Sequence, residues 1–484
     1  MEGMVMSYIP EQKFNRSTFG DTVTTELRPY VTLKATYGIL DECESFSATG
    51  GAVAATNGEF VLTTGTSIGG YGIIWSRQPV VYLPGVGAEA RATARFTTGV
   101  ANSLQSVGFF SSTDGMFFGY NGTSFGIMHR YHGEIEVRTL TVTSGSGGAA
   151  TVTVTLDGVA YTAAITSGST TQNAHEIEHA LNAGAAATLW NIQHIGSTVV
   201  FVYKWAGAKS GAYSVSVSAG TFAGNIAQNK AGATPTETWT AKASWNVDTA
   251  SWLDPTKGNL FKFEFAYLGY GPLRFSVFNP TRREWQLVHV VDWANANAQT
   301  NFGNPSLRVG WVSASLGSTT NLTVAGASAM GGLQGRVDRS HVFGQPGTAT
   351  GVTTQTQVLS IQIRREFGDR SNNSIMTPKL LSIGTDSTKG AVFRIFLNPT
   401  VSGTTAHAYI DETNSICTYD TAGTTVSGGR NLGVYSVGPS GRASISLDDL
   451  NIVLIAGDEL VITAEVTSGP ASEMTAAITW NEIH

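Results

Sequence analysis

The sequence predicts an all-β protein with two β-sandwich domains of the jelly-roll or lectin-like kind, the first interrupted by a small ββαββ insert. Three observations favour this fold class. Glycine is over-used, with 56 of 484 residues, and charged residues make up only 13% of the chain. Short runs of alternating apolar and polar residues recur between turn residues. Many short strands joined by tight turns are typical of sandwiches and jelly rolls.

The clearest predicted strand is the segment 261–267, Phe-Lys-Phe-Glu-Phe-Ala-Tyr. Its aromatic side chains alternate with Lys262, Glu264 and Ala266, so they share one face of a strand. The turn Leu-Gly-Tyr-Gly-Pro follows at 268–272, and apolar alternation then resumes. This pattern predicts a β-hairpin with one buried aromatic face.

The amino-acid composition changes between residues 139 and 241, where aromatic residues become rare. Two alternating runs, 151–156 and 159–165, flank Asp157-Gly158, which is a signal for a two-residue hairpin turn. An apolar stripe predicts a helix over 171–183, with Gly184 as its stop. Two further strands are expected near 198–203 and 212–218. Because the aromatic-rich composition of the predicted sandwich resumes afterwards, this unit is predicted to be inserted in a surface loop.

These changes in composition give the expected domain boundaries. A length of 484 residues suits about three domains, each able to bury a core. The prediction assigns an N-terminal arm to 1–30, the first β-sandwich to 31–138 and 242–335, the insert to 139–241, a Gly/Thr-rich linker to 336–357, and the C-terminal β-sandwich to 358–484.

Charge and hydropathy exclude several classes of partner. A formal net charge of −6 and a pI near 5.9 argue against nucleic-acid binding. No apolar run approaches the ~20 residues that span a bilayer, so no membrane insertion is expected. The start of the chain has no signal-peptide pattern, so synthesis in a cytoplasm is expected. Cys43 and Cys417 are expected to be free thiols. The low charge suggests a surface covered by partner subunits.

The sharpest chemical motif is the His-Glu-Ile-Glu-His run at 175–179, on the predicted helix. In metalloproteases the two histidines of such a motif bind zinc and the glutamate acts as a base. A third ligand is needed, yet no Asp or Glu occurs between His179 and Glu237. His194 is the only nearby candidate, and it is expected on the next strand. We therefore predict no metal and no cofactor; His175 and His179 are the candidates for a zinc-hydrolase alternative.

Two other groups of residues are candidates for sugar chemistry or sugar binding. Glu134 and Glu136 lie at i, i+2 on a predicted strand, but their Cβ atoms would be about 7 Å apart, wider than the roughly 5–5.5 Å between carboxyl groups that retaining glycosidases need. An exposed strand face is the expected alternative. Aromatic rings near amides can also stack on sugars; the candidate glycan-binding residues are Trp285, His289, Trp293, Asn295 and Asn297.

Several segments carry a resemblance to a known group of proteins. Glu26–Leu40, Tyr82–Glu89, Gly108–Gly119, Trp245–Asp248 and Gly258–Gly271, with His289 and Asn304–Leu307, resemble uncharacterised structural proteins of tailed bacteriophages and other large DNA viruses. The insert looks like small modules that recur in phage tail and capsid proteins. The ending Ile478–Glu482 is similar to the end of a β-sandwich module in virion proteins.

The resemblance implies a virion component such as a fibre, a tail adaptor, or a minor capsid or decoration protein, and it carries over no catalytic residues. The leading hypothesis is therefore a non-enzymatic structural protein of a virus particle, with other virion proteins and copies of itself as partners. A host-glycan-binding attachment module is the alternative. An enzyme, either the zinc hydrolase or a glycosidase, is the second alternative.

Overall fold

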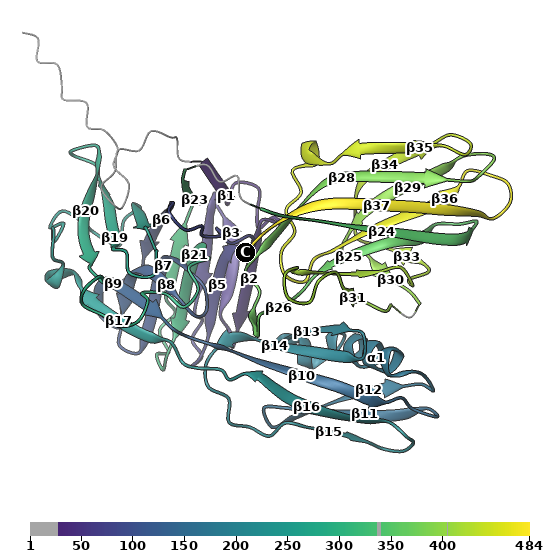
Figure 1. Cartoon of the computed structure of the whole chain (residues 1–484). Coiled ribbons are helices and arrows are strands. Elements are labelled where there is room, and N and C mark those ends of the chain that lie inside the picture. Colours follow the sequence, from purple (N-terminus) through teal and green to yellow (C-terminus); the bar gives the residue numbers. More distant parts are fainter. Residues whose placement is uncertain (1–27, 336–339, 404) are drawn as a thin grey trace, which may run out of the picture. The chain divides into compact units, whose positions relative to one another are not determined.

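The computed structural model describes residues 28–335, 340–403 and 405–484. Over this range the chain is almost entirely antiparallel β-structure, which confirms the predicted fold class (Figure 1). Most of the predicted arm, residues 1–27, lies outside the described residues, and its last part begins the first strand at Arg28. The chain divides into two compact units. Unit 1 contains 115–129 and 237–337 with the N-terminal part up to Ser111, and unit 2 contains 112–114, 130–236 and 338–484.

Unit 1 is the first sandwich, built from two large sheets. One sheet contains β1 (Arg28–Lys34), β3 (Ala52–Thr56), β4 (Glu59–Thr63), β6 (Gly87–Phe96), β18 (Asn259–Phe265), β19 (Leu273–Asn279), β20 (Glu284–Val291), β22 (Thr323–Gly326) and β23 (Ser328–Gln334). The other contains β2 (Cys43–Ala48), β5 (Tyr71–Ser76), β7 (Ser103–Phe110), β8 (Gly115–Asn121), β9 (Ser124–Tyr131), β17 (Thr236–Ala241) and β21 (Arg308–Ser315). A short 3₁₀ turn, Lys242–Ser244, follows β17.

The core of unit 1 is aromatic. The predicted hairpin is present as β18 and β19, and Phe261, Phe263 and Phe265 of β18 are all fully buried. Phe118 of the opposite sheet packs on them, with its ring centroid 4.8 Å from that of Phe261. The two sheets therefore meet through side chains that the period-two pattern had placed on one face.

The insert occupies a different range from the one expected. β10 (Ile135–Ser144) starts before residue 139 and belongs to the insert, whereas β17 pairs with β9 in unit 1. The insert is therefore 130–236. The prediction missed these bounds because the change in aromatic content does not coincide with the point where the chain passes from one unit to the other. It is also larger than ββαββ: one sheet has the order β13-β14-β10-β16 and the other β12-β11-β15.

The remaining elements of the insert agree with the predicted order. They are β11 (Ala150–Leu156), β12 (Val159–Ile165), α1 (Thr170–Asn182), the 3₁₀ turn η1 (Ala185–Thr188), β13 (Trp190–Ile195), β14 (Thr198–Ala206), β15 (Ser214–Val217) and β16 (Ala223–Lys230). Asp157 and Gly158 both have positive φ, 50° and 80°, as the two-residue turn requires.

The C-terminal sandwich begins earlier than expected. The segment predicted as a linker forms the strand β24 (His341–Val352), which pairs along its length with the last strand, β37 (Ser472–Ile483). One of its glycines has a packing reason, because a Cβ at Gly347 would lie 2.4 Å from the carbonyl oxygen of Val358 in β25. Gly347 therefore marks a close approach of two strands.

Two sheets form the C-terminal sandwich around an aliphatic core. The first has the order β24-β37-β28-β35, and the second β31-β32-β25-β36-β29-β34. Their strands are β25 (Thr356–Ile363), β28 (Ile375–Thr385), β29 (Ala391–Leu397), β31 (Ala408–Tyr409), β32 (Cys417–Asp420), β34 (Arg430–Val437), β35 (Arg442–Ser446) and β36 (Glu459–Val466). Short elements are β26 (Glu366–Phe367), β27 (Arg370–Ser371), β30 (Thr400–Val401), β33 (Val426–Ser427) and η3 (Asp448–Leu450).

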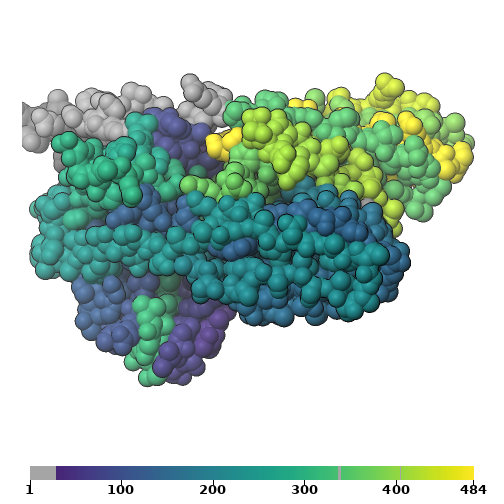
Figure 2. Space-filling view, turned by 60° about the horizontal axis from the view of Figure 1, so that its bottom comes forward, coloured from purple at the N-terminus to yellow at the C-terminus, as the bar shows by residue number. Residues whose placement is uncertain are grey.

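The insert and the C-terminal sandwich belong to the same unit, and their surfaces abut in the space-filling view (Figure 2). Polar contacts join them. We call this contact region the seam; it comprises Gln193, His194 and Gly196 of the insert and Gln362, Arg365, Thr405 and His407 of the sandwich. The buried Gln193 donates from Nε2 to Gln362 Oε1 at 2.6 Å and accepts from the Arg365 backbone N–H at 2.8 Å. The Gly196 N–H donates to the His407 carbonyl at 2.8 Å.

Candidate metal site at the seam

The helix α1 sets the position of the first two site residues. Ser169 caps its N-terminus by accepting a hydrogen bond from the Gln172 N–H. The helix buries Ala174, Ile177 and Leu181 in the core of the insert, as the apolar stripe predicted. His175 and Glu178 stand three residues apart, so their side chains lie on the same face of the helix, one turn apart.

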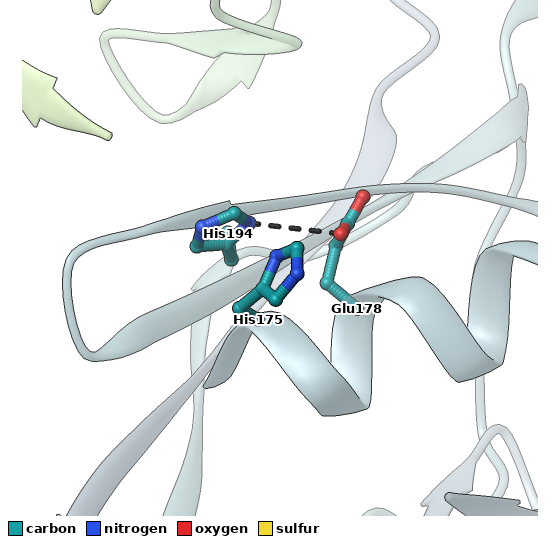
Figure 3. A group of neighbouring side chains, drawn as sticks. All are labelled: His175, Glu178 and His194. Atoms are coloured by element: carbon teal, nitrogen blue, oxygen red, sulfur yellow. Dashed lines mark ion pairs between the residues drawn. The ribbon is translucent and has the colours of Figure 1, made fainter. Parts of the chain in front are cut away.

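The third site residue comes from the neighbouring strand β13. His194 is buried and pairs in register with Val199 of β14. Its Nδ1 lies 3.6 Å from Glu178 Oε2, and its ring centroid lies 5.0 Å from that of His175 (Figure 3). One ligand atom from each of His175, Glu178 and His194 falls within 4.8 Å of the others. The fold thus gathers two imidazoles and a carboxylate at one point.

Each of these three side chains has one polar atom that is hydrogen-bonded to a further group. Thr405 Oγ1 hydrogen-bonds to His175 Nδ1 at 3.0 Å, and the Thr405 carbonyl oxygen lies 3.3 Å from His194 Nε2. Asn182 Nδ2 donates to Glu178 Oε1. Each side chain is therefore oriented by a second group, which leaves Glu178 Oε2 and His194 Nδ1 facing one another.

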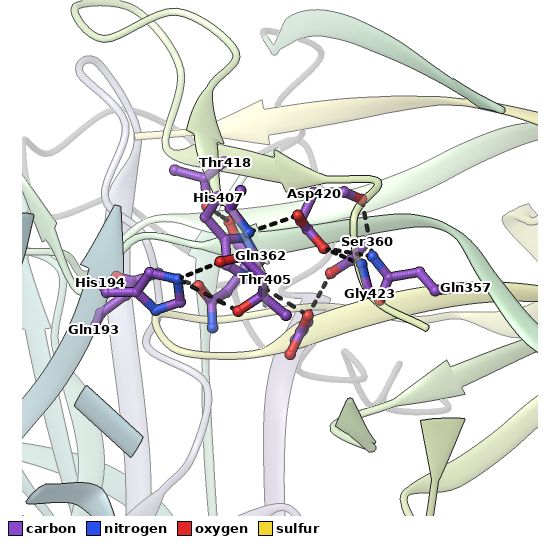
Figure 4. Close-up of polar contacts among 12 residues, drawn as sticks. Gln193, His194, Gln357, Ser360, Gln362, Thr405, His407, Thr418, Asp420 and Gly423 are labelled. Atoms are coloured by element: carbon purple, nitrogen blue, oxygen red, sulfur yellow. Dashed lines mark hydrogen bonds and ion pairs between the residues drawn. The ribbon is translucent and has the colours of Figure 1, made fainter. Parts of the chain in front are cut away.

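A group of polar side chains from the C-terminal sandwich lies beside His194 (Figure 4). His407 is buried; its ring is 5.5 Å from that of His194, and its Nε2 is 3.8 Å from Glu459 Oε1. Asp420 accepts hydrogen bonds from Gln357 Nε2 and from the Ala406 N–H. Ser360 Oγ donates to Glu459.

Burial governs the ionisation of these groups. It lowers the pKa of His407 to about 4, with a further contribution from His194, and so favours the neutral ring. Burial raises the pKa of Glu459 to about 7, against the opposing effect of the Ser360 hydrogen bond. The pKa of His175 is lowered, first by burial and then by His194. For Glu178 burial alone would raise the pKa, but its contacts with His194, His175 and Asn182 leave it lowered.

The arrangement differs from the one that the His-Glu-x-x-His motif suggested. His179 is exposed and lies outside the group of three, although its ring is 6.2 Å from that of His175. His194 lies on the next strand, as expected. Sequence reasoning missed Glu178 because it sought an acidic ligand downstream of the motif. The available signal was the i, i+3 spacing of His175 and Glu178 on a helix.

The two acidic residues considered for glycosidase chemistry are held in ion pairs. Glu136 is buried, which corrects the expectation of an exposed strand face, and it accepts from Arg138 Nε at 2.6 Å and from the Gly232 N–H at 2.6 Å. Glu134 pairs with Lys230 at 3.3 Å and with Arg370 at 3.4 Å. Buried charge in this position needs such partners, so Glu136 is explained by the packing of the insert.

The residues considered for glycan binding do not form one open platform. His289 and Trp293 are buried: His289 Nδ1 accepts from the Asn246 N–H at 3.1 Å, and Trp293 Nε1 donates to the Gln299 carbonyl. Trp285 is partly accessible, and the side chains of Arg91 and Lys262 lie over its ring. Asn295 is exposed, with a φ of 60°, and Asn297 donates to the Trp293 carbonyl.

Comparisons with known proteins give only distant likenesses. No protein-family model matches the chain, and no curated protein matches its sequence. Among solved structures, arcelin-5, a lectin-like defence protein from Phaseolus vulgaris, aligns with 63% of this chain and 99% of its own at 9% identity and a TM-score of 0.25. A structure of infectious bursal disease virus, Gt strain, aligns with 84% of this chain and 76% of its own at 10% identity and a TM-score of 0.16.

The major capsid protein of Faustovirus aligns with 95% of this chain and 92% of its own, at 9% identity and a TM-score of 0.08. The resemblance to viral capsid proteins and to a lectin-like protein is therefore loose, and at these TM-scores it carries no inference about function. Among the helices of the described residues, none has the length and apolar character to cross a membrane.

Proposed function

We propose that the chain is a non-enzymatic structural protein of a virus particle, which assembles with other virion proteins and with copies of itself. The support from sequence is the set of segments that resemble virion structural proteins, together with a charged fraction of only 13%. The observation that carries the proposal furthest is the chemistry of two sheet edges.

The strands β3 and β12 each lie at the edge of a sheet, one in each unit. Neither contains Asp, Glu, Lys or Arg: β3 reads Ala-Val-Ala-Ala-Thr and β12 Val-Ala-Tyr-Thr-Ala-Ala-Ile. An edge strand exposes unpaired backbone groups, and monomeric proteins commonly protect such edges with charged side chains or proline. Uncharged edges are suited to pairing with a neighbouring subunit.

The location of the protein gives the first test. Particles purified from an infected host should contain the chain at a constant ratio to the other structural proteins, measured by quantitative mass spectrometry, and antibodies to unit 1 should label particles in the electron microscope. Absence of the chain from washed, intact particles would overturn the proposal.

The edges give a second test, on the purified chain. Ala54 of β3 and Thr162 of β12 are exposed, so a lysine at either position adds a charge without entering a core. Ala54→Lys and Thr162→Lys should reduce self-association, measured by analytical ultracentrifugation, while leaving the melting temperature of the monomer unchanged. Thr151→Lys is the matched control, because Thr151 is exposed on β11, the central strand of the same sheet as β12.

A further inference from the structure

We infer that His175, Glu178 and His194 form a binding site for a single Zn²⁺ ion, which fastens the helix α1 to the strand β13 beside the C-terminal sandwich. The inference goes beyond the proposed function, because it assigns a ligand and a structural role to the seam. The ligand set also differs from the His175/His179 pair of the sequence motif.

The donor atoms fit zinc in kind and in spacing. Two imidazole nitrogens and a carboxylate oxygen are ordinary zinc ligands, at bond lengths of about 2.0–2.2 Å. Tetrahedral ligands at such lengths are about 3.4 Å apart. The 3.6 Å between His194 Nδ1 and Glu178 Oε2 is close to that value, and it is longer than a hydrogen bond. The separation among all three donors is at most 4.8 Å, so tetrahedral binding requires them to approach by up to about 1.4 Å.

The hydrogen bonds around the three side chains are those that zinc ligands need. A histidine that binds a metal through one ring nitrogen donates its other N–H to a carbonyl or carboxylate, which fixes the tautomer. The Thr405 carbonyl has this position at His194 Nε2, and Thr405 Oγ1 engages His175 Nδ1. Asn182 holds the second oxygen of Glu178. Thr405 thereby connects a site on the insert to the C-terminal sandwich.

An ion pair between a protonated His194 and Glu178 is the competing explanation for this geometry. It accounts for two of the three residues but gives no role to His175, whose ring lies 5.0 Å from that of His194. A shared cation gives all three groups one common partner.

The test uses the full chain, stripped with a chelator, dialysed, and titrated with ZnCl₂ by calorimetry. The wild type should bind one Zn²⁺, and its melting temperature should rise with zinc. His175→Gln and Glu178→Gln should each weaken zinc binding by at least about 100-fold, more than the 10- to 100-fold expected for an outer partner such as Thr405→Val. His179→Gln is the matched control, on the same helix and beside His175, and should bind zinc like the wild type.

Melting of each variant without zinc shows whether it is folded; His175→Gln is the safest, because the His175 ring is only partly buried. Replacement of zinc by Co²⁺ gives an independent readout, since a tetrahedral site should show a visible absorption band that His194→Gln lacks. Less than one zinc per wild-type chain would overturn the inference. So would unchanged binding in His175→Gln, or a loss of binding in His179→Gln that leaves His194→Gln unaffected.

Discussion

Unit 1 and unit 2 hold their parts together in different ways. In unit 1 two large sheets share one aromatic core, in which the ring of Phe118 packs on the rings of Phe261, Phe263 and Phe275. In unit 2 the insert and the C-terminal sandwich each have a core of their own, and their seam is polar. Apolar contact is non-directional, whereas each polar contact depends on a partner in one position.

This difference predicts which kinds of change should destabilise each unit. Unit 1 should respond mainly to changes in side-chain volume. The seam of unit 2 should respond to protonation, to loss of single hydrogen bonds and to zinc. Four substitutions test the contrast, since each removes one type of interaction.

The largest effect is expected from the aromatic core. Phe118→Ala should lower the free energy of unfolding of unit 1 by about 3–5 kcal/mol, because it removes a fully buried ring and leaves a cavity. Chemical denaturation of the full chain, followed by tryptophan fluorescence, measures it. The control is Phe278→Ala on β19, where the ring is only partly buried and the loss should be smaller. Equal losses at both positions would show that the core does not dominate unit 1.

The features that could be predicted from the sequence are those that depend on residues close together in the chain. The alternation in 261–267, the turn residues Asp157-Gly158 and the apolar stripe of α1 each lie within one short segment. The strand β24 was not predictable in this way, since its Gly/Thr-rich sequence is equally typical of a linker, and pairing with β37 more than a hundred residues later decides the outcome.

The site at the seam was predictable only in part for the same reason. His175 and Glu178 lie within one helical turn, but Thr405 and His407 belong to a loop of another domain, and Glu459 to a later strand. Nothing in the local pattern around any of them indicates that they meet. The sequence motif therefore lies on the helix that supplies His175 and Glu178 to the group, whereas the partners of these residues depend on tertiary contacts.

The second prediction concerns Glu459, whose pKa is raised to about 7 by burial. Because the folded state binds this proton more tightly than the unfolded chain does, the stability it supports is present below about pH 4.5 and is lost as pH rises through 7. Glu459→Gln stays neutral, so relative to the wild type it should gain stability across that window, by roughly 3 kcal/mol. Thermal melts with chelator from pH 4 to 8 measure the difference.

Ser360 supplies a control for this prediction that acts in the opposite direction. Its hydroxyl donates to Glu459 and lowers the carboxyl pKa. Ser360→Ala should therefore raise the pKa of Glu459 further and move the pH-dependent loss of stability to higher pH. A constant difference between Glu459→Gln and the wild type at every pH would contradict the assignment of a raised pKa to this residue.

The third prediction separates the hydrogen bonds of the seam from its charges. Gln193→Ala should destabilise unit 2 by about 1–2 kcal/mol, because it removes the hydrogen bonds that the buried Gln193 makes to Gln362 Oε1 and to the Arg365 N–H. A double-mutant cycle with Gln362→Ala should show coupling between the two side chains. Additive losses would mean that the contact across the seam contributes nothing of its own.

The smallest effect is expected from the exposed ion pair between Arg370 of the C-terminal sandwich and Glu134 of the insert. Arg370 Nη2 lies 3.4 Å from Glu134 Oε1, and the Arg370 side chain is 49% exposed. Exposed ion pairs contribute about 0–1 kcal/mol and are screened by salt. Glu134 also keeps Lys230 at 3.3 Å as a second partner, so Arg370→Gln should cost a few tenths of a kcal/mol at low salt and nothing in about 1 M NaCl. A larger loss of stability that persists in high salt would show that this exposed ion pair stabilises unit 2 as much as a buried hydrogen-bonded side chain does. The contrast with Gln193→Ala would then be wrong.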